Sequence, residues 1–532
     1  MVQDHEPACS KKNEIQLKVL KSLSLKLFLL DMSTPVRVRF APSPTGPLHI
    51  GGLRTALFNY LFAKKHNGSF ILRIEDTDQK RYVKNSEEHI YESLDWAGLR
   101  ADEGPNVGSI GYKQSERKKL YNEKITYLIE NNYAYYAFDT QDELNSYRNE
   151  CENNGDKFVY GPKNREQLKN SISFGNDKTN KLISKGCEYV IRFKVPESSE
   201  IKCKDFLKGV VQVSSNTLDD KVLYKSDGNP TYHFANVVDD LDMKISHVIR
   251  GEEWLPSLPL HSLIYSAFKQ KEPVFIHLPL ILKPQGIGKL SKRDGEKFGF
   301  PVFPISWKEG DLEIKGFREE GYLPEAVLNF LALLGWNPGN DEEFFLINDL
   351  IKSFSLDALN KSSARFDPKK NLWFNQRHIQ SIKNSKLEEL LIGELERNKT
   401  SFDKNKIPNI VSLIKNRLSV TTNIFETTSY FFSDPKDFDF KFLKKFEAKE
   451  AKTLLSLSAN IITNSDFNKT EIIKQNFEEL ACKREISFGK FLGLFRVALI
   501  GKLAGADLFE TMKLVGKEAV LKRLLNLSDL IS

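Results

Sequence analysis

The stretch Val36–Asp78, "VRVRFAPSPTGPLHIGGLRTALFNYLFAKKHNGSFILRIEDTD", decides the fold of this 532-residue chain. Val36–Phe40 alternates apolar and basic side chains, which predicts a strand. Apolar residues recur at three- and four-residue spacing through Gly51–His66, which predicts an amphipathic helix. Ser69–Ile74 then predicts a second strand. A strand–loop–helix–strand unit of this kind implies parallel strands joined by a right-handed crossover.

The loop between the first strand and the helix, "APSPTGPLHIGG", has the features of a phosphate site. Three prolines stiffen it, and His49, Gly51 and Gly52 arrive at the start of the helix. Free backbone N–H groups and the positive end of the helix dipole favour anions there, and an imidazole can donate to a phosphate oxygen. The loop is neither a Walker loop nor GxGxxG. We expect a nucleotide-phosphate site; a proline-rich turn whose histidine only caps the helix is the alternative.

These residues also carry a family resemblance. "HIGG" (His49–Gly52) is similar to the HIGH signature of class I aminoacyl-tRNA synthetases, and "RFAPSPTGPLHIGGLRTALFN" followed by "RIEDTD" closely resembles glutamyl-tRNA synthetases. Gly52 stands where the name of the signature has a second histidine, which leaves His49 as the main imidazole. The resemblance is strong to about Asp367 and weaker after it. It implies that L-glutamate is activated with ATP and transferred to the 3′-terminal adenosine of tRNA(Glu).

A second segment, "PQGIGKLSKRDGEKFG" (Pro284–Gly299), is similar to the KMSKS signature of the same class. Its glycines predict a mobile loop, and its cations would stabilise charge as pyrophosphate leaves. Taken alone, such a loop is more often a solvated turn. With the first motif, the resemblance implies catalytic roles for His49, Lys289 and Lys292. The implied ATP-binding set is His49, Gly51, Gly52, Lys289, Ser291, Lys292 and Arg293.

A glutamate pocket needs guanidinium groups for carboxylates and one carboxylate for the ammonium group. Arg39 and Glu75 each end a predicted strand, so we expect both side chains at the carboxyl edge of the sheet, where open α/β sheets bind ligands. The segment "PTYHFANVVDDLDMKISHVIRGEEWLPS" (Pro230–Ser257) resembles the family's second substrate segment. The implied glutamate-binding set is Arg39, Ala41, Ser43, Glu75, Tyr232 and Arg250.

The expected fold class is α/β, with a Rossmann-like parallel sheet, an inserted acceptor-end-binding domain and an all-α anticodon-binding region. Helical spacing in segments such as "KLEELLIGELER" favours the all-helical tail over a β-barrel. The expected divisions are an N-terminal extension (1–34), the two halves of the catalytic domain (35–113 and 230–285), the insert (114–229), the lysine loop with a stem-contact region (286–368), and the helical tail (369–532).

Composition limits the cofactors and the location. The five cysteines are far apart and form no CxxC pair, so we expect no zinc and a reducing compartment. Mg²⁺ is expected with ATP, held mainly by phosphates and water. No apolar run approaches the ~20 residues of a membrane span. We expect a cytoplasmic monomer; the mitochondrial matrix is the alternative if residues 1–31 are a transit peptide.

Three other functions fit the sequence less well. A glutamyl-transferring paralogue that modifies a tRNA base would lack the helical tail. A non-catalytic RNA-binding paralogue would not need His49, Lys289, Lys292, Arg39 and Glu75 together. Glutaminyl-tRNA synthetase is a near neighbour that "RFAPSPTG" and the helical tail disfavour. The net charge of +7 suits an acidic partner and equally suits a lysine-rich solvated surface.

Overall fold

The structure, a computed structural model, describes residues 35–531. The expected N-terminal extension and transit peptide lie outside the described residues. Two compact units are present. The first comprises residues 35–312 and 331–366, and the second comprises residues 313–330 and 367–531.

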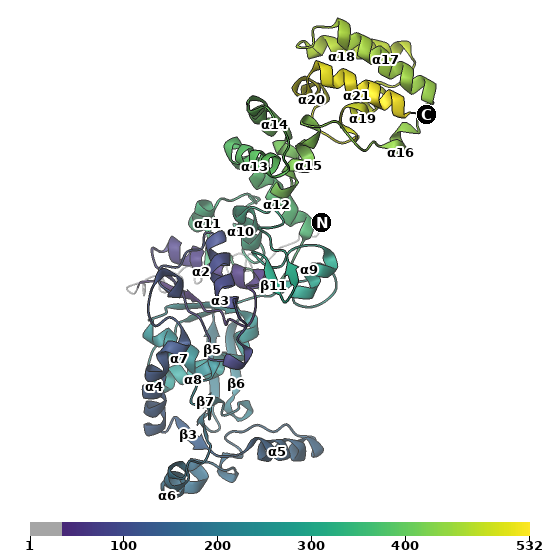
Figure 1. Cartoon of the computed structure of the whole chain (residues 1–532). Helices are drawn as coiled ribbons and strands as arrows, with labels where there is room; N and C mark the ends of the chain where they lie inside the picture. Colours follow the sequence, from purple (N-terminus) through teal and green to yellow (C-terminus); the bar gives the residue numbers. More distant parts are fainter. Residues whose placement is uncertain (1–34, 532) are drawn as a thin grey trace, which may run out of the picture. The chain divides into compact units, whose positions relative to one another are not determined.

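The first unit is built on a six-stranded sheet of order β2-β1-β8-β9-β5-β6 (Figure 1). Five of its strands are parallel and β6 is antiparallel to β5. Its interior is apolar, as in parallel sheets covered on both faces. The strands are β1 Arg37–Phe40, β2 Ser69–Leu72, β5 Glu200–Asp205, β6 Gly209–Ser214, β8 His247–Gly251 and β9 Val274–Leu278.

The opening unit of the sequence folds as predicted. Strand β1 pairs in parallel with β2, and α2 (Ile50–Lys65) connects them and packs on both. Gly68 ends the crossover at a point where a Cβ would lie 2.2 Å from the carbonyl oxygen of Val36, so only glycine fits. The predicted second strand is shorter than expected, because β2 ends at Leu72 and Glu75 lies in the following loop.

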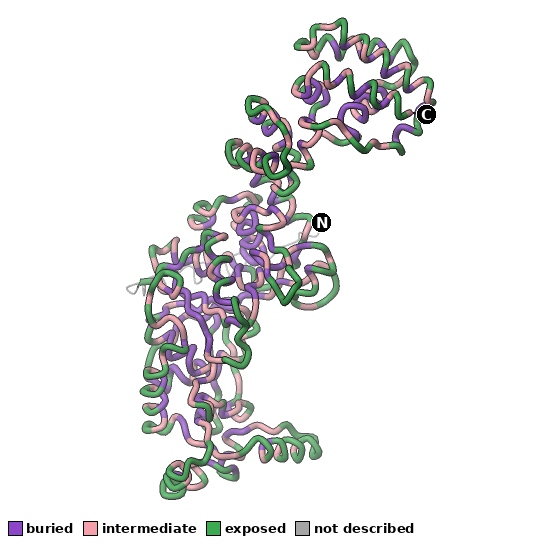
Figure 2. The backbone as a smooth tube through the Cα atoms, viewed as in Figure 1, coloured by how far each residue is buried: buried purple, intermediate pink, exposed green. Residues whose placement is uncertain are grey.

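The strands of residues 114–229 divide between two sheets. Three of them, β3 (Ala134–Ala137), β4 (Val190–Phe193) and β7 (Val222–Tyr224), form a small antiparallel sheet. The other two, β5 and β6, extend the main sheet through the pairing of β5 with β9. Helices α5 (Gln141–Asn153) and α6 (Ser171–Ser184) are largely exposed (Figure 2).

The second unit is helical from Asp367 to Ile531, as the spacing predicts; the described part of this region contains no strand. Leucine, isoleucine and phenylalanine side chains of its helices form one buried core. The helices are α12 Pro368–Ser381, α13 Asn384–Arg397, α14 Ile407–Ile414, α15 Ile424–Thr428, α16 Phe440–Leu443, α17 Ala448–Asn464, α18 Thr470–Lys483, α19 Phe488–Ile500, α20 Leu508–Val515 and α21 Lys517–Leu530.

The remaining elements lie wholly or partly in the first unit. The helices are α3 Ser86–Trp96, α4 Lys118–Glu130, α7 Tyr232–Asp242, α8 Leu258–Ala267, α9 Lys292–Phe298, α10 Pro324–Leu333 and α11 Ile347–Ser353; the short strands are β10 Ile281–Leu282, β11 Trp307–Glu309, β12 Leu312–Ile314 and β13 Ala364–Arg365. Among residues 35–531, no helix has the length and apolar character that a membrane span requires.

Candidate active site

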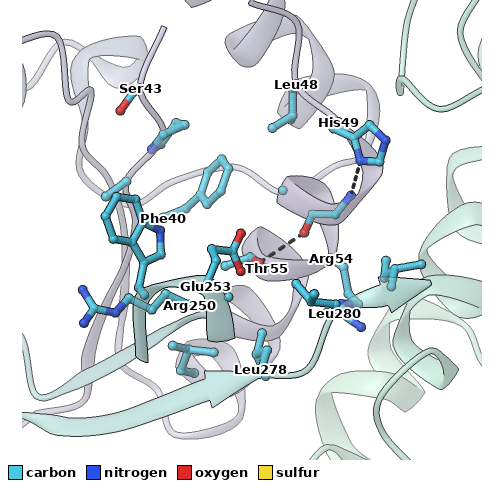
Figure 3. A pocket seen from close by; sticks show the side chains of 18 of the residues that line it. Phe40, Ser43, Leu48, His49, Arg54, Thr55, Arg250, Glu253, Leu278 and Leu280 are labelled. Carbon is cyan, nitrogen blue, oxygen red and sulfur yellow. Dashed lines mark hydrogen bonds between the residues drawn. The ribbon is translucent and has the colours of Figure 1, made fainter. Parts of the chain in front are cut away.

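A cavity of about 590 Å³ opens at the carboxyl edge of the main sheet, where β1, β8 and β9 end and α2 begins. Figure 3 shows side chains from these elements around it, including His49, Arg250 and Glu253. Twelve of the thirteen residues predicted from the sequence line this one cavity: Arg39, Ala41, Ser43, His49, Gly51, Gly52, Glu75, Tyr232, Arg250, Lys289, Ser291 and Lys292. Arg293 is exposed and does not line it.

His49 is the N-cap of α2, and its protonation follows from its contacts. The backbone N–H of Gly51 donates to His49 Nδ1 at 3.2 Å, so the proton of a neutral ring resides on Nε2. Nε2 is buried and has no partner among the described residues. Burial, followed by the charges of Lys289 and Lys292, lowers the pKa of His49 to about 4. The ring is therefore a neutral hydrogen-bond donor near pH 7.

The glycines beside His49 have different surroundings. A Cβ at Gly51 would lie 3.5 Å from His49 Nδ1, which is ordinary contact. A Cβ at Gly52 would lie 2.7 Å from Cδ1 of Leu48, whose side chain fills that space. Gly52 thus lets Leu48 pack under the start of α2.

The second half of the lysine segment is a helix, whereas its sequence predicts a loop through Gly299. Lys292–Phe298 forms helix α9, which the Asp294 carboxylate caps by accepting from the backbone N–H and hydroxyl of Ser291. Gly295 is buried, and a Cβ there would lie 2.8 Å from the carbonyl oxygen of Phe300. That glycine therefore serves close packing.

The two predicted lysines approach the cavity from different positions. Lys292 Nζ lies 5.7 Å from the ring centroid of Phe303, and the His49 ring contacts the same phenylalanine edge-on. Lys289 Nζ donates to Glu253 Oε1 at 2.9 Å, and both of these side chains are about half exposed. The cavity mouth next to His49 is therefore cationic.

A network of buried charged side chains supports another part of the cavity wall, and this network was not predicted from the sequence. Arg39 donates twice to Asp240, with nitrogen–oxygen distances of 3.1 and 3.3 Å. Arg73 bridges Asp240 at 2.7 Å and Glu75 at 3.1 Å, and Asn236 also donates to Glu75 at 3.0 Å. Burial alone would raise the pKa of Asp240, but the two guanidinium groups outweigh it and the pKa is lowered.

Glu75 accepts both of its hydrogen bonds on Oε1, which leaves Oε2 without a partner among the described residues. Burial raises the pKa of Glu75 despite the neighbouring arginines Arg73 and Arg39. A bound cation would therefore stabilise its ionised form. Across the cavity, Arg250 Nη2 is likewise buried without a partner. The site thus offers a free carboxylate oxygen and a free guanidinium nitrogen.

The comparisons with known proteins agree on one family. Residues 35–373 match the family described as tRNA synthetases class I (E and Q), catalytic domain, and residues 384–527 match the anticodon binding domain. The glutamate–tRNA ligase of Christiangramia forsetii is 50% identical over 93% of this chain and 98% of its own length. That of Bacteroides thetaiotaomicron is 45% identical over 92% of this chain and 97% of its own length.

Solved structures give the same answer. The crystal structure of a glutamate tRNA ligase from Elizabethkingia meningosepticum, in complex with its amino acid, matches with a TM-score of 0.89 at 45% identity, covering 94% of this chain and all of that one. The enzyme from Elizabethkingia anophelis matches with a TM-score of 0.85 at 46% identity, covering 93% and 100%.

The chain belongs to the glutamate–tRNA ligases. It is a class I aminoacyl-tRNA synthetase, as the sequence resemblance indicates, and its helical tail is of the anticodon-binding kind. The comparisons give no support to the tRNA-modifying or non-catalytic alternatives.

Sequence reasoning about this ligase missed most of the residues that hold the cavity-lining charged groups in place. Asn236 and Asp240 lie on α7 four residues apart, so one helix face serves both Glu75 and Arg39. Trp254 stacks on Tyr232 with ring centroids 4.0 Å apart. The segment "YHFANVVDD" contained a signal, because Asn236, Asp239 and Asp240 are polar residues among the apolar Phe234, Ala235, Val237 and Val238.

Proposed function

We propose that the ligase forms glutamyl adenylate in this cavity and then transfers the glutamyl group to tRNA(Glu). A carboxylate oxygen of glutamate attacks the α-phosphorus of ATP, and the bond to the bridging oxygen breaks as pyrophosphate leaves. A hydroxyl of the terminal adenosine of tRNA then attacks the acyl carbon, loses its proton and releases AMP. Positioning and charge stabilisation suffice for both steps, without a covalent enzyme intermediate.

The observation that carries this proposal is a pair of buried donors, His49 Nε2 and Arg250 Nη2, which line one cavity and have no partner among residues 35–531. Buried N–H groups are ordinarily paired, so both indicate positions where a ligand oxygen binds. His49 Nε2 lies at the N-terminus of α2, where a phosphate is favoured. Arg250 donates from Nη1 to the Tyr232 hydroxyl at 3.2 Å, which leaves Nη2 as the nitrogen that a carboxylate would meet.

The proposed roles follow from these positions. Glu75 Oε2 receives the ammonium group of glutamate, while Arg39, Arg250 and Tyr232 face its carboxylates and Ala41 and Ser43 line the pocket. Lys289 and Lys292 stabilise the phosphates, with Ser291 beside them and Gly51 and Gly52 leaving backbone exposed to ATP. Arg293, which is exposed outside the cavity, is proposed to contact ATP only through movement of α9.

Mg²⁺ is proposed to enter with ATP. Only two carboxylates, Glu75 and Glu253, line the cavity, and residues 35–531 contain no cluster of three or more His, Cys, Asp or Glu side chains arranged for a metal. This donor set suits an ion held mainly by phosphates and water. When bound, Mg²⁺ neutralises phosphate charge.

We further propose a cytoplasmic monomer whose helical tail binds the anticodon of tRNA(Glu). The family match of residues 384–527 supports the last part. Sedimentation at working concentrations tests the monomer.

Amino-acid-dependent exchange of labelled pyrophosphate into ATP, with tRNA and Mg²⁺ present, tests adenylate formation. Exchange with glutamate, and much less with glutamine or aspartate, is the expected result. Equal exchange with glutamine would contradict the proposed pocket, since unpaired cationic groups should disfavour an uncharged side chain.

A further inference from the structure

Arg39 and Arg250, two of the three arginines that line the cavity, are held in different ways. Arg39 is 3% exposed and forms a two-pronged ion pair with the equally buried Asp240, so its charge is compensated before any ligand arrives. Arg250 is 5% exposed, yet no carboxylate of residues 35–531 lies within ion-pair distance of it. Its partners are a phenol and two imidazoles.

One imidazole belongs to a line of groups across three neighbouring strands. Arg250 on β8 pairs in register with His277 on β9, and Arg250 Nε donates to His277 Nε2 at 3.1 Å. On the far side of the ring, His277 Nδ1 lies 2.7 Å from Asp205 Oδ2 at the end of β5. Because a guanidinium can only donate, Nε2 must accept and the ring proton must reside on Nδ1, facing Asp205.

The other imidazole comes from α8. His261 Nδ1 faces Arg250 Nη1 at 3.5 Å, and His261 Nε2 lies 3.2 Å from His233 Nδ1. The same argument makes Nδ1 the acceptor and places the proton on Nε2, directed at His233. Burial, followed by the charge of Arg250, lowers the pKa of His261 well below its usual range, and burial lowers that of His277. Both rings therefore act as neutral acceptors.

These contacts account for the orientation of the guanidinium. Its Nε–H is directed at His277, its Nη1 donates to Tyr232 at 3.2 Å and faces His261, and its Nη2 remains without a partner in the cavity wall. Neutral acceptors fix the plane of the group without cancelling its charge. A carboxylate in either imidazole position would hold it equally well but would compete with the ligand for that charge.

We propose that His261 and His277 are positioning residues that orient Arg250 through neutral acceptors and so reserve its charge for a carboxylate of the substrate. This inference rests on the proposed role of Arg250 in binding glutamate. It predicts that the charge of the group at position 261, and not only its shape, sets the affinity for glutamate.

Glutamine and glutamate at position 261 form a matched pair. The amide of His261→Gln can accept from Arg250 through its oxygen and donate to His233 through its nitrogen, so it reproduces both contacts. His261→Glu offers the same shape with a negative charge. Aminoacylation of tRNA(Glu) gives KM for glutamate, KM for ATP and kcat for each variant, and thermal melting reports folding.

The expected result is a KM for glutamate within about threefold of the wild type for His261→Gln and at least about tenfold higher for His261→Glu, equivalent to about 1.4 kcal/mol. KM for ATP should stay within about threefold in both. Equal KM values for glutamate in the two variants, or an equal rise in both KM values of His261→Glu, would overturn the inference.

If the His261→Glu variant does not fold, a second pair of variants, at position 277, tests the same inference. His277→Gln keeps an acceptor for Arg250 and a donor for Asp205, whereas His277→Met keeps only the volume. A higher KM for glutamate in His277→Met alone supports the inference, and equal values overturn it. A wild-type enzyme that does not use glutamate at all would instead overturn the proposed function.

Discussion

His49 caps α2 by accepting a hydrogen bond from the backbone N–H of Gly51 at 3.2 Å, so one ring nitrogen holds the helix while the other faces the cavity. His49→Asn separates these roles, because asparagine is a good N-cap but cannot place a donor where Nε2 lies. We expect a melting temperature within a few degrees of the wild type and a loss of about 10²–10³-fold in glutamate-dependent pyrophosphate exchange.

His49→Ala is the matched comparison. It should lose a similar amount of exchange activity and, in addition, about 1 kcal/mol of stability with the cap. Full exchange activity in His49→Asn would show that the free Nε2–H does not contact the reacting phosphate.

The ion pair between Lys289 and Glu253 should compete with ATP for the lysine. Both side chains are about half exposed, so the pair contributes less than about 1 kcal/mol and a triphosphate can displace it. Glu253→Gln removes the competitor, and we expect the KM for ATP to fall up to about fivefold with the KM for glutamate unchanged. A higher KM for ATP would mean that Glu253 assists ATP binding. Steady-state aminoacylation measures both constants.

The buried pair of Arg39 and Asp240 should matter far more for stability than a surface pair. Asp240→Ala leaves Arg39 and Arg73 without their main partner, which typically costs about 3–5 kcal/mol. Asp95→Ala removes a pair with Arg100 that is more than two-thirds exposed, and should cost under about 1 kcal/mol. Urea unfolding of both variants makes the comparison; similar losses in the two would contradict the network described here.

Stability should fall in mild acid because several histidines are buried in the neutral form. Burial lowers the pKa to about 4 in His49, His233, His247 and His378. Between about pH 6.5 and pH 4 the unfolded chain therefore binds more protons at these rings than the folded chain, so the free energy of unfolding decreases as pH falls through that window. Burial raises the pKa of Asp220 to about 6 and also raises the pKa values of Glu75 and Asp239, so these carboxyls oppose the trend. The lowered pKa values of His261 and His277 add to it.

The measurement is the urea midpoint at pH 7.5 and at pH 5.0. A lower midpoint at pH 5.0 is expected. An unchanged or higher midpoint would mean that these rings are already protonated in the folded chain.

The sequence predicted the parts of the site that local chemistry determines. Proline and glycine around His49, the helical spacing after it and the alternation before it are all local signals, and β1, α2 and β2 lie within two residues of the predicted bounds. The helical tail was predictable for the same reason. Most of the roles given to individual site residues were inferred from the family resemblance, and these roles remain proposals.

The supporting contacts were not predictable, because they join residues far apart in the chain. The contacts among Asp205, Arg250 and His277 form only because their strands, β5, β8 and β9, are neighbours in the sheet. Local sequence patterns do not predict the order of strands in a sheet. Helix α9 was not predicted for a different reason. The glycines of this segment favour a loop, whereas Gly295 is buried against the backbone of Phe300.

The most direct test of the account is aminoacylation of separated glutamate- and glutamine-accepting tRNAs with labelled glutamate, ATP and Mg²⁺. The variant Lys292→Ala tests whether the lysine that lines the cavity is needed for activity. Lys297 lies on the same helix but does not line the cavity, so Lys297→Ala is the control. We expect charging of tRNA(Glu) by the wild type and by Lys297→Ala, with a loss of about 10²-fold or more in Lys292→Ala. Failure of the wild type to charge tRNA(Glu), or full activity of Lys292→Ala, would contradict it.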